Sequence, residues 1–262
     1  MTPDLSIIIP AFNESARLPT TLRAAHDFVR ERANVVEMIV VDDGSTDDTS
    51  RAAEQACPAT QSTGTGGAPD SAFALRVIRH DRNRGKGAAV RTGLESAHGE
   101  LALVCDADGA APFGEFGRLR DAIAAGADIA IGSRDAPGAQ LAPAQPLARR
   151  WAALAFRAIR RQILLPGIRD TQCGFKLFRI APIRAILPHA RCDGWLGDVE
   201  LLALAERFGL RIDEVGITWS HQPQSHVRPL LDAPRVLLDL LRIRRRVRAI
   251  RPGTSVRGEP PT

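Results

Sequence analysis

The chain has 262 residues, of which 44% are hydrophobic and 25% are charged. This composition is that of a globular protein, and it excludes a fibrous or wholly disordered chain. The longest apolar runs are far shorter than the roughly 18 to 20 residues of a membrane-spanning helix, so we expect no spanning segment. The formal net charge is +5, and six arginines fall within residues 242–251.

Strand patterns rich in β-branched residues alternate with helical patterns through the first half of the chain. The predicted strands are residues 6–10, 37–41, 75–79, 101–105 and 128–132. The predicted helices between them are residues 15–32, 47–56, 86–97 and 113–125. This alternation predicts an α/β, Rossmann-like fold with a mainly parallel sheet flanked by helices.

The second half is less regular. Residues 57–71 and 135–146 are rich in Gly, Ser, Thr, Ala or Pro. We expect the first segment to be a surface insertion and the second to be a candidate lid. Further predicted elements are a helix at 147–165, a strand at 173–178, a helix at 197–209, a strand at 214–221 and a last helix from about residue 234.

These patterns favour one large domain over residues 1–232, a basic amphipathic helix over 233–251 and a disordered tail over 252–262. The N-terminus has no charged region or cleavage site typical of a secretory signal, so we expect a cytoplasmic protein. The four cysteines form no C-x-x-C pair, which favours reduced structural thiols.

Three predicted strands are followed by acidic segments, namely PAFNE, DDGSTDDT and DADG. Ligands of open parallel sheets bind beyond the carboxyl ends of the strands. The first turn lacks G-x-G-x-x-G, and no G-x-x-x-x-G-K-[ST] occurs, which argues against a dinucleotide-binding enzyme and a P-loop protein.

Each acidic segment has a structural alternative. Asp42 and Asp43 fit a turn before a helix as well as a ligand site. Asp106 and Asp108 also fit a turn, but two carboxylates so close at a buried strand end repel each other unless a cation lies between them. Their hard oxygen ligands suit Mg²⁺ or Mn²⁺.

In this order, SIIIPAFNE, VVDDGSTDDT, NRGKGAAVRTG, DADG, RDTQCGFKLF and WLGDVELL resemble the family 2 inverting glycosyltransferases of the GT-A fold. The resemblance covers about residues 5–229. It is greatest to the branch that transfers glucose or mannose to dolichyl or other polyprenyl phosphates, and within it to the dolichyl-phosphate β-glucosyltransferases.

The resemblance implies a nucleotide-sugar donor that is held at the first strand ends. Lys86 would approach the donor with glycines on both sides, although a solvated helix start is the alternative. Asp106 and Asp108 would bind the metal that bridges the donor diphosphate, so that Asp108 also counts as catalytic. Mannosyl relatives often carry a third acid or an amide where this chain has Ala110, and this difference fits the glucosyl branch better. The remaining implied donor residues are Pro10, Ala11, Phe12, Glu14 and Asp43, of which Phe12 has simple packing as its alternative.

On the acceptor side, the resemblance makes Asp198 the candidate base or sugar-orienting residue, with helix capping as the alternative. Glu200 is disfavoured because residues two apart on a helix point to different faces. The phosphate of the acceptor calls for cations. The implied acceptor-phosphate residues are Arg134, Arg169, Lys176, Ser225 and Arg228. No histidine pair has metal-ligand spacing, so we expect the histidines to be incidental.

The resemblance therefore implies inverting, non-processive transfer of one hexose, with glucose from UDP-glucose favoured, to a polyprenyl or dolichyl phosphate. A Q-x-x-R-W motif typical of processive synthases is missing. Mannose from GDP-mannose and transfer to a soluble acceptor remain alternatives.

Finally, Val236, Leu240, Ile243, Val247 and Ile250 form one apolar helical stripe, with arginines on the other faces. Such a helix can lie peripherally on the cytoplasmic face of an anionic membrane, or pack on the protein itself. Binding of nucleic acid by the same arginines is a remote alternative, which a steep loss of duplex affinity with salt would favour. We expect no nucleic-acid partner.

Overall fold

The computed structural model describes residues 3–30, 35–56, 73–142, 156–220 and 229–251. Its main sheet has seven strands in the order β3-β2-β1-β4-β7-β5-β8. The strands are β1 (Leu5–Ala11), β2 (Val36–Asp42), β3 (Phe73–Arg79), β4 (Leu101–Cys105), β5 (Ile129–Ser133), β7 (Phe175–Arg179) and β8 (Ile212–Gly216). The predicted mainly parallel α/β sheet is confirmed.

One strand departs from the parallel pattern. β7 lies between β4 and β5 and is antiparallel to both. The other neighbours, β1 with β2 and β4, β2 with β3, and β5 with β8, are parallel. β7 therefore joins two parallel blocks into one sheet.

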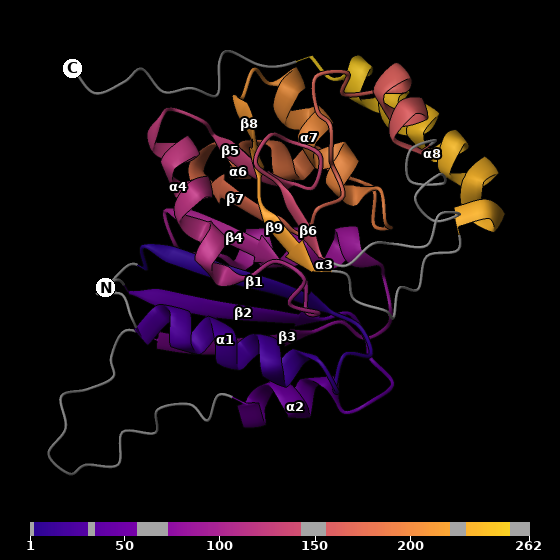
Figure 1. Cartoon of the computed structure of the whole chain (residues 1–262). Helices are drawn as coiled ribbons and strands as arrows, with labels where there is room; N and C mark the ends of the chain where they lie inside the picture. Colours follow the sequence, from indigo (N-terminus) through magenta and orange to yellow (C-terminus); the bar gives the residue numbers. More distant parts are fainter. Residues whose placement is uncertain (1–2, 31–34, 57–72, 143–155, 221–228, 252–262) are drawn as a thin grey trace, which may run out of the picture.

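Helices cover both faces of the sheet (Figure 1). They are α1 (Leu18–Arg30), α2 (Thr49–Ala56), α3 (Lys86–Ser96), α4 (Phe116–Ala124), α6 (Ile180–Ile186), α7 (Gly197–Arg207) and α8 (Pro229–Ala249), with a further helix at residues 156–163. Successive residues of a strand point to opposite faces. In β1, Ile8 therefore packs with α3, α6, α7 and α8, whereas Ile7 and Ile9 pack with α1, α2 and α4.

The predicted strand 214–221 is in fact two strands. It divides after β8, and β9 (Thr218–Ser220) pairs in parallel with β6 (Gln140–Ala142) as a separate two-stranded sheet. β6 occupies part of the segment 135–146 that we expected to be a lid, so these three residues are strand. The backbone N–H of Ser220 donates to the carbonyl of Ala110 at 2.8 Å, which ties this small sheet to the loop after β4.

α8 begins before the predicted start at residue 234, and its apolar stripe packs on the protein itself. Leu240, Ile243 and Val247 are buried in the core that includes α7. Of the two alternatives for this stripe, the structure shows the one in which it packs on the protein itself. None of the helices in the described part of the chain is both long and apolar enough to cross a membrane.

Some expectations concern segments outside the described residues. These are the insertion at 57–71, the start of the helix predicted at 147–165 and the tail at 252–262.

Candidate active site

The loops after β1, β2 and β4 lie at one edge of the sheet. Because β1 pairs in parallel with both β2 and β4, the three strands end on the same side. The loops begin at Phe12, Asp43 and Asp106. The three acidic segments of the sequence therefore meet at the edge where ligands of such sheets bind.

Asp106 is paired with Lys86, the first residue of α3. The ammonium Nζ of Lys86 lies 2.7 Å from Oδ1 of Asp106. Burial disfavours both charges, but their mutual attraction outweighs it, so that the pKa of Lys86 is raised and that of Asp106 is lowered. Lys86 is thus not simply a solvated residue at a helix start.

Gly174 provides the space for the Asp106 carboxylate. A Cβ atom at Gly174 would lie 1.9 Å from Oδ2 of Asp106, far inside contact distance. The carbonyl of Gly174 also accepts the backbone N–H of Asp106 at 3.0 Å, so the two residues are held together. No side chain larger than hydrogen fits at position 174 while Asp106 keeps this position.

Asp198 is buried in the first turn of α7 and faces two lysines. Nζ of Lys176 donates to Oδ2 of Asp198 at 3.1 Å, and Nζ of Lys86 lies 3.9 Å from the same oxygen. The N-cap residue of α7 is Leu196, so the alternative that Asp198 caps this helix is wrong. Asp106, Lys86, Asp198 and Lys176 form a row of alternating charges, which we call the charge row.

Asp108 lies beside the charge row with a different electrostatic balance. Burial and the charge of Asp106 both raise the pKa of Asp108, against the N–H of Ala110, which donates to its Oδ1 at 3.1 Å. Asp106 contacts Lys86 directly, whereas for Asp108 burial and then the repulsion of Asp106 outweigh the attraction of Arg17 and Lys86. A further cation at this position would favour the charged form of Asp108.

Glu200 points away from the charge row, as its position two residues beyond Asp198 predicts. Its buried carboxylate accepts the backbone N–H groups of Arg191 and Cys192 and pairs with Arg246 of α8 at 2.7 Å. It therefore fastens α8 and the loop before α7 to the same helix that carries Asp198.

The glycines on both sides of Lys86 allow another part of the chain to come close to them. In the structure this is the protein's own backbone in the loop before α7. Gly85 has a φ of 111°, which disfavours other residues. The N–H groups of Gly87 and Ala88 donate to the carbonyls of residues 194 and 193 at 3.2 and 3.0 Å. The start of α3 is therefore capped by the loop before α7, which fixes where Lys86 begins.

Asp43 holds the loop that leads into α3 through hydrogen bonds to its backbone. It is buried, and its carboxylate accepts the N–H groups of Arg84 at 3.0 Å and Gly85 at 2.7 Å. His80 Nδ1 lies 2.7 Å from the same carboxylate, and His80 Nε2 lies 3.0 Å from the Thr92 hydroxyl. Contact of Asp43 with a nucleoside stays a prediction.

The expectation that all histidines are incidental is wrong for His80, which is buried between Asp43 and Thr92. A single histidine has no spacing that marks it in a sequence. Its position directly after β3 was the available signal.

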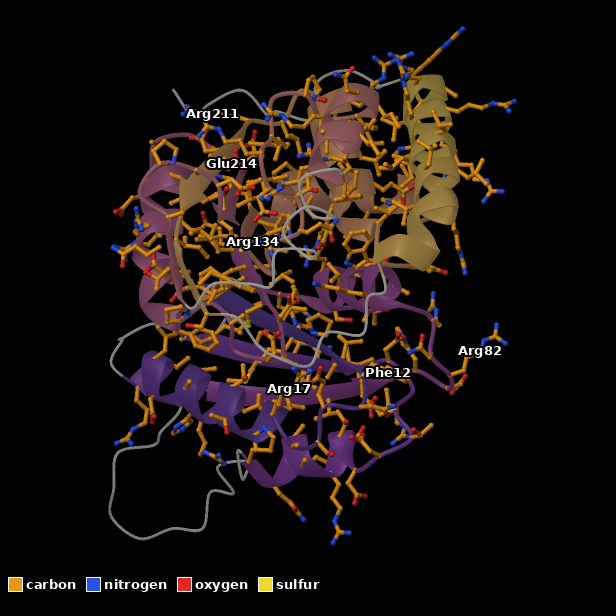
Figure 2. All side chains as sticks on the ribbon, turned by 45° about the vertical axis from the view of Figure 1, so that its right-hand side comes forward. Phe12, Arg17, Arg82, Arg134, Arg211 and Glu214 are labelled. Carbon is orange, nitrogen blue, oxygen red and sulfur yellow. The ribbon has the colours of Figure 1, made fainter. Side chains whose placement is uncertain are left out.

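The loop after β1 offers one exposed aromatic ring and an ion pair. Pro10 and Ala11 are buried at the end of β1, but Phe12 is 37% exposed, so its ring is not packed in the core. Glu14 accepts from Nε of Arg17 at 2.7 Å. Burial opposes the charge of Arg17, but the carboxylates of Glu14 and then Asp108 outweigh it and raise the pKa of Arg17. Arg17 is therefore a site residue that the sequence motifs did not predict. Figure 2 shows Phe12 and Arg17 in the lower half of the molecule and Arg134 in the upper half.

Of the predicted acceptor-phosphate residues, Arg134 is the most firmly held. Its guanidinium makes two hydrogen bonds to Asp170, at 2.6 and 2.9 Å, and lies 5.3 Å from the ring centroid of Trp219. Burial opposes the charge of Asp170, but Arg134 outweighs it and lowers the pKa of Asp170 to about 2. Arg169 is exposed, and its guanidinium reaches the carbonyl of Asp135 at 3.4 Å.

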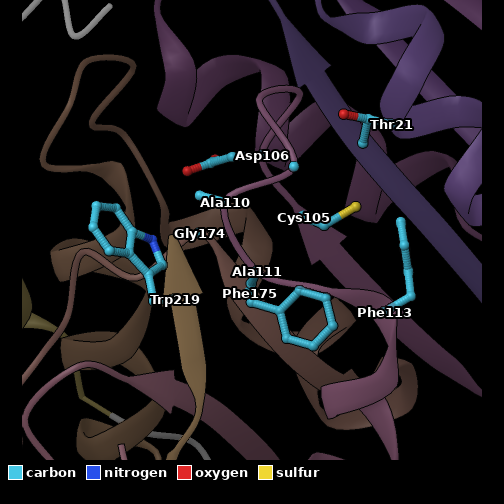
Figure 3. Close-up of a pocket in the computed structure, with 10 residues that line it drawn as sticks. Thr21, Cys105, Asp106, Ala110, Ala111, Phe113, Gly174, Phe175 and Trp219 are labelled. Carbon is cyan, nitrogen blue, oxygen red and sulfur yellow. The ribbon is translucent and has the colours of Figure 1, made fainter. Parts of the chain in front are cut away.

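Three of these five residues lie in the described part of the chain. Among them, Lys176 is buried against Asp198, whereas Arg134 is paired with Asp170. Ser225 and Arg228 lie outside the described residues. A hollow beside Asp106 is lined also by Ala110, Gly174 and Trp219 (Figure 3). This hollow extends the charge row toward the small sheet.

Comparison with known proteins identifies the family. Residues 6–187 match the family described as glycosyl transferase family 2. The chain belongs to this family. Similar proteins include the dolichyl-phosphate beta-glucosyltransferases of Dictyostelium discoideum, 32% identical over 92% of this chain and 73% of that protein, and of Saccharomyces cerevisiae, 34% identical over 92% and 74%. The human protein of the same name is 34% identical over 94% of this chain and 76% of its own length.

Solved structures agree with the GT-A fold. A mycobacterial protein superposes with a TM-score of 0.64, at 19% identity, over 92% of this chain and 73% of its own. Glucosyl-3-phosphoglycerate synthase of Mycobacterium tuberculosis, in complex with Mn²⁺, UDP-glucose and glycerol 3-phosphate, has a TM-score of 0.60 at 17% identity, over 92% and 78%. At this identity the likeness concerns the fold alone.

The residues of this family 2 site fit a divalent metal that shares its ligands with a substrate. Within the described part of the chain, no three His, Cys, Asp or Glu side chains gather as a complete metal cage. Asp106 and Asp108 nevertheless supply hard carboxylate oxygens. Burial and then the charge of Asp106 raise the pKa of Asp108, and a dication beside both carboxylates would counter that repulsion. Such a metal would take its other ligands from phosphate oxygens and water.

Proposed function

We propose that this glycosyltransferase transfers glucose from UDP-glucose to a dolichyl or other polyprenyl phosphate, with inversion, to give a β-linked lipid-phosphate sugar. The observation that carries the proposal is the charge row at the carboxyl edge of a GT-A sheet. Relatives that match 92% to 94% of the chain are dolichyl-phosphate beta-glucosyltransferases, which supports both donor sugar and acceptor.

On the donor side, Lys86 would contact the diphosphate, and Asp106 with Asp108 would hold Mg²⁺ or Mn²⁺. When bound, the metal would neutralise the charge that develops on the departing UDP. The Mn²⁺ and UDP-glucose bound to the mycobacterial synthase of the same fold support this proposal. Phe12, exposed at the end of β1, is available to stack on the nucleobase.

In the proposed reaction, an acceptor phosphate oxygen attacks the anomeric carbon of glucose. The new carbon–oxygen bond forms as the bond from that carbon to the UDP oxygen breaks, and its electron pair leaves with UDP. A phosphate monoester is largely ionised above a pH of about 6, so no proton has to be removed from it. We therefore propose that Asp198 orients Lys86, Lys176 and the donor sugar, and does not act as a base.

The acceptor phosphate would be drawn by positive groups. Arg134 lies over the ring of Trp219, which lines the hollow, and keeps a fixed position through Asp170. Arg169 is exposed. Contacts from Ser225 and Arg228 remain part of the proposal. Because a polyprenyl phosphate sits in a bilayer, the proposal includes peripheral contact with an anionic membrane.

The test is a transfer assay with purified protein in detergent. Radiolabelled UDP-glucose or GDP-mannose is incubated with Mn²⁺ or Mg²⁺, with and without polyprenyl phosphate, and label in the organic phase is counted. We expect acceptor-dependent transfer from UDP-glucose. Transfer from GDP-mannose alone would correct the donor, and transfer to a water-soluble acceptor without lipid would refute the acceptor.

Asp106→Asn tests the site itself. It should abolish metal-dependent transfer, because it removes one of the two carboxylates and the partner of Lys86. Asp121→Asn, at an exposed residue of α4, is the matched control and should keep full activity. Equal activity of both variants would show that the site lies elsewhere.

A further inference from the structure

Exposed apolar side chains of the described residues are concentrated on two helices. Five large hydrophobic residues are exposed, and only Phe12 belongs to the active-site edge. The other four are Ile159 of helix 156–163, 45% exposed, and Leu237, Leu238 and Leu241 of α8, 41%, 54% and 44% exposed. Single exposed leucines are ordinary, but a group of this kind marks an interaction site.

These leucines are distinct from the stripe that holds α8 to the protein. Leu240, Ile243 and Val247 are buried, and Arg246 pairs with Glu200 of α7. Leu237 and Leu241 are four residues apart, so they lie on one face, and Leu238 adjoins them. α8 therefore has an inner apolar face that the fold uses and an outer apolar group that the fold leaves in solvent.

The outer group is accompanied by positive charge. Arg235, Arg242, Arg245 and Arg248 are all exposed on α8. Asp239, the acidic residue among the described side chains of the helix, is hydrogen-bonded to Arg242 at 2.9 Å. The exposed part of α8 is thus both apolar and strongly basic.

The position of these helices suits access to the active site. Figure 1 shows α8 on the right of the molecule, the side toward which β1 and β2 run and where their carboxyl ends lie. Helix 156–163, in salmon, lies beside α8 in Figures 1 and 2. A flat partner that covered the outer face of α8 would therefore lie next to the edge with the charge row.

We propose that the α8 surface, defined as Ile159, Leu237, Leu238 and Leu241 with Arg235, Arg242, Arg245 and Arg248, docks on an anionic lipid membrane. Leucines that enter the acyl boundary beside arginines at the headgroups are the pattern of an interfacial helix. Arginine alone would serve a nucleic acid equally well, but the exposed leucines favour lipid. The inference extends the proposed function, since it supplies the route to a lipid-bound acceptor.

The first experiment measures binding of the full chain to vesicles, without donor or acceptor. Vesicles contain phosphatidylcholine alone or phosphatidylcholine with phosphatidylglycerol, and bound protein is quantified by flotation. We expect binding to the anionic vesicles only. Leu237→Ser/Leu238→Ser/Leu241→Ser and, separately, Arg242→Glu/Arg245→Glu should each weaken it by roughly tenfold or more.

The matched control is Arg23→Glu/Arg120→Glu, which reverses two exposed arginines on α1 and α4, on the opposite face of the sheet. It should bind anionic vesicles like the wild type. If the control weakens binding as much as Arg242→Glu/Arg245→Glu does, net charge and not the α8 surface is responsible, and the proposal is wrong.

The second experiment separates docking from catalysis. With polyprenyl phosphate in detergent, both α8 variants should keep wild-type transfer rates, because none of their residues belongs to the site. With the acceptor embedded in anionic vesicles, both should lose roughly tenfold or more of their activity. Loss of transfer in detergent would mean that a variant is misfolded or that the proposed function is wrong. Wild-type binding to vesicles by both variants would refute the proposal that the α8 surface docks on the membrane.

Two other binding partners of the α8 surface would also refute the membrane proposal. The first is RNA, if the protein binds duplex or single-stranded RNA tightly but does not bind vesicles, and if Arg242→Glu/Arg245→Glu abolishes the RNA binding. The other is a concentration-dependent dimer, seen by sedimentation, that the three leucine substitutions abolish.

Discussion

Replacing Gly174 with Ala should disable the site through a single methyl group. The added Cβ would lie 1.9 Å from Oδ2 and 2.1 Å from Cγ of Asp106, whereas ordinary contact begins at 3.4 Å. The carboxylate must therefore move by roughly 1.5 Å, which breaks its 2.7 Å contact with Lys86. Neither backbone can yield easily, because the Gly174 carbonyl accepts the N–H of Asp106 and β7 pairs with β4 directly beyond.

A displacement of this size at a reacting centre costs on the order of 100-fold in rate. The fold should lose only about 1 to 3 kcal/mol of its unfolding free energy, as for other overpacked sites. Transfer from UDP-glucose is measured together with urea unfolding. Gly167→Ala is the matched control, since nothing lies within 4 Å of the Cβ that it adds. Wild-type transfer by Gly174→Ala would refute the assignment of Asp106 to the site.

Three further substitutions test separate contacts. Lys86→Met should weaken UDP binding, measured by calorimetry with Mn²⁺, by roughly 10- to 100-fold, because a charged hydrogen bond is lost; unchanged affinity would remove Lys86 from the donor site. Glu200→Ala should lower the unfolding free energy by about 2 kcal/mol, because two backbone N–H groups and Arg246 lose their acceptor, and a change no larger than that of Arg246→Ala would refute this role. The pKa of Asp170 is lowered to about 2, so its pair with Arg134 should stabilise the fold fully above pH 4 and lose about 2 kcal/mol as the pH falls toward 2; acid unfolding of Asp170→Asn should lack that dependence.

The sequence was sufficient to place the acids but not to pair them. Strand periodicity and the βαβ alternation predict that the segments after β1, β2 and β4 share an edge, because parallel strands that are neighbours end together. The same local patterns gave no sign that Asp198 meets Lys176, which comes from β7. That contact depends on the antiparallel placement of β7 between β4 and β5, and local periodicity carries no information about strand order.

A similar limit explains why the sequence left two alternatives open for α8. A period of 3.6 residues shows that Leu240, Ile243 and Val247 share a face, but not which surface covers that face. The structure shows that α7 and the core do so. Once this face is assigned, the exposed Leu237 and Leu241 can be recognised as a separate apolar group on the outer side of α8.

The balance of charge at the site favours a dication as part of the proposed donor site. Of the three carboxylates Asp106, Asp108 and Asp198, only Asp106 and Asp198 contact the ammonium groups of Lys86 and Lys176. Arg17 and Arg134 also attract Asp108 and Asp106, but each of these arginines is itself paired with a further carboxylate, that of Glu14 or Asp170. This excess of negative charge would repel a nucleotide diphosphate, although Lys86 lies where its phosphates are proposed to bind. A dication held by Asp106 and Asp108 would reverse the sign of the local charge and leave Lys86 available to the donor. In the proposed mechanism, donor binding and the departure of UDP would both depend on the positive charge that such a dication would supply, and Asp198 keeps both lysines in place without taking a proton.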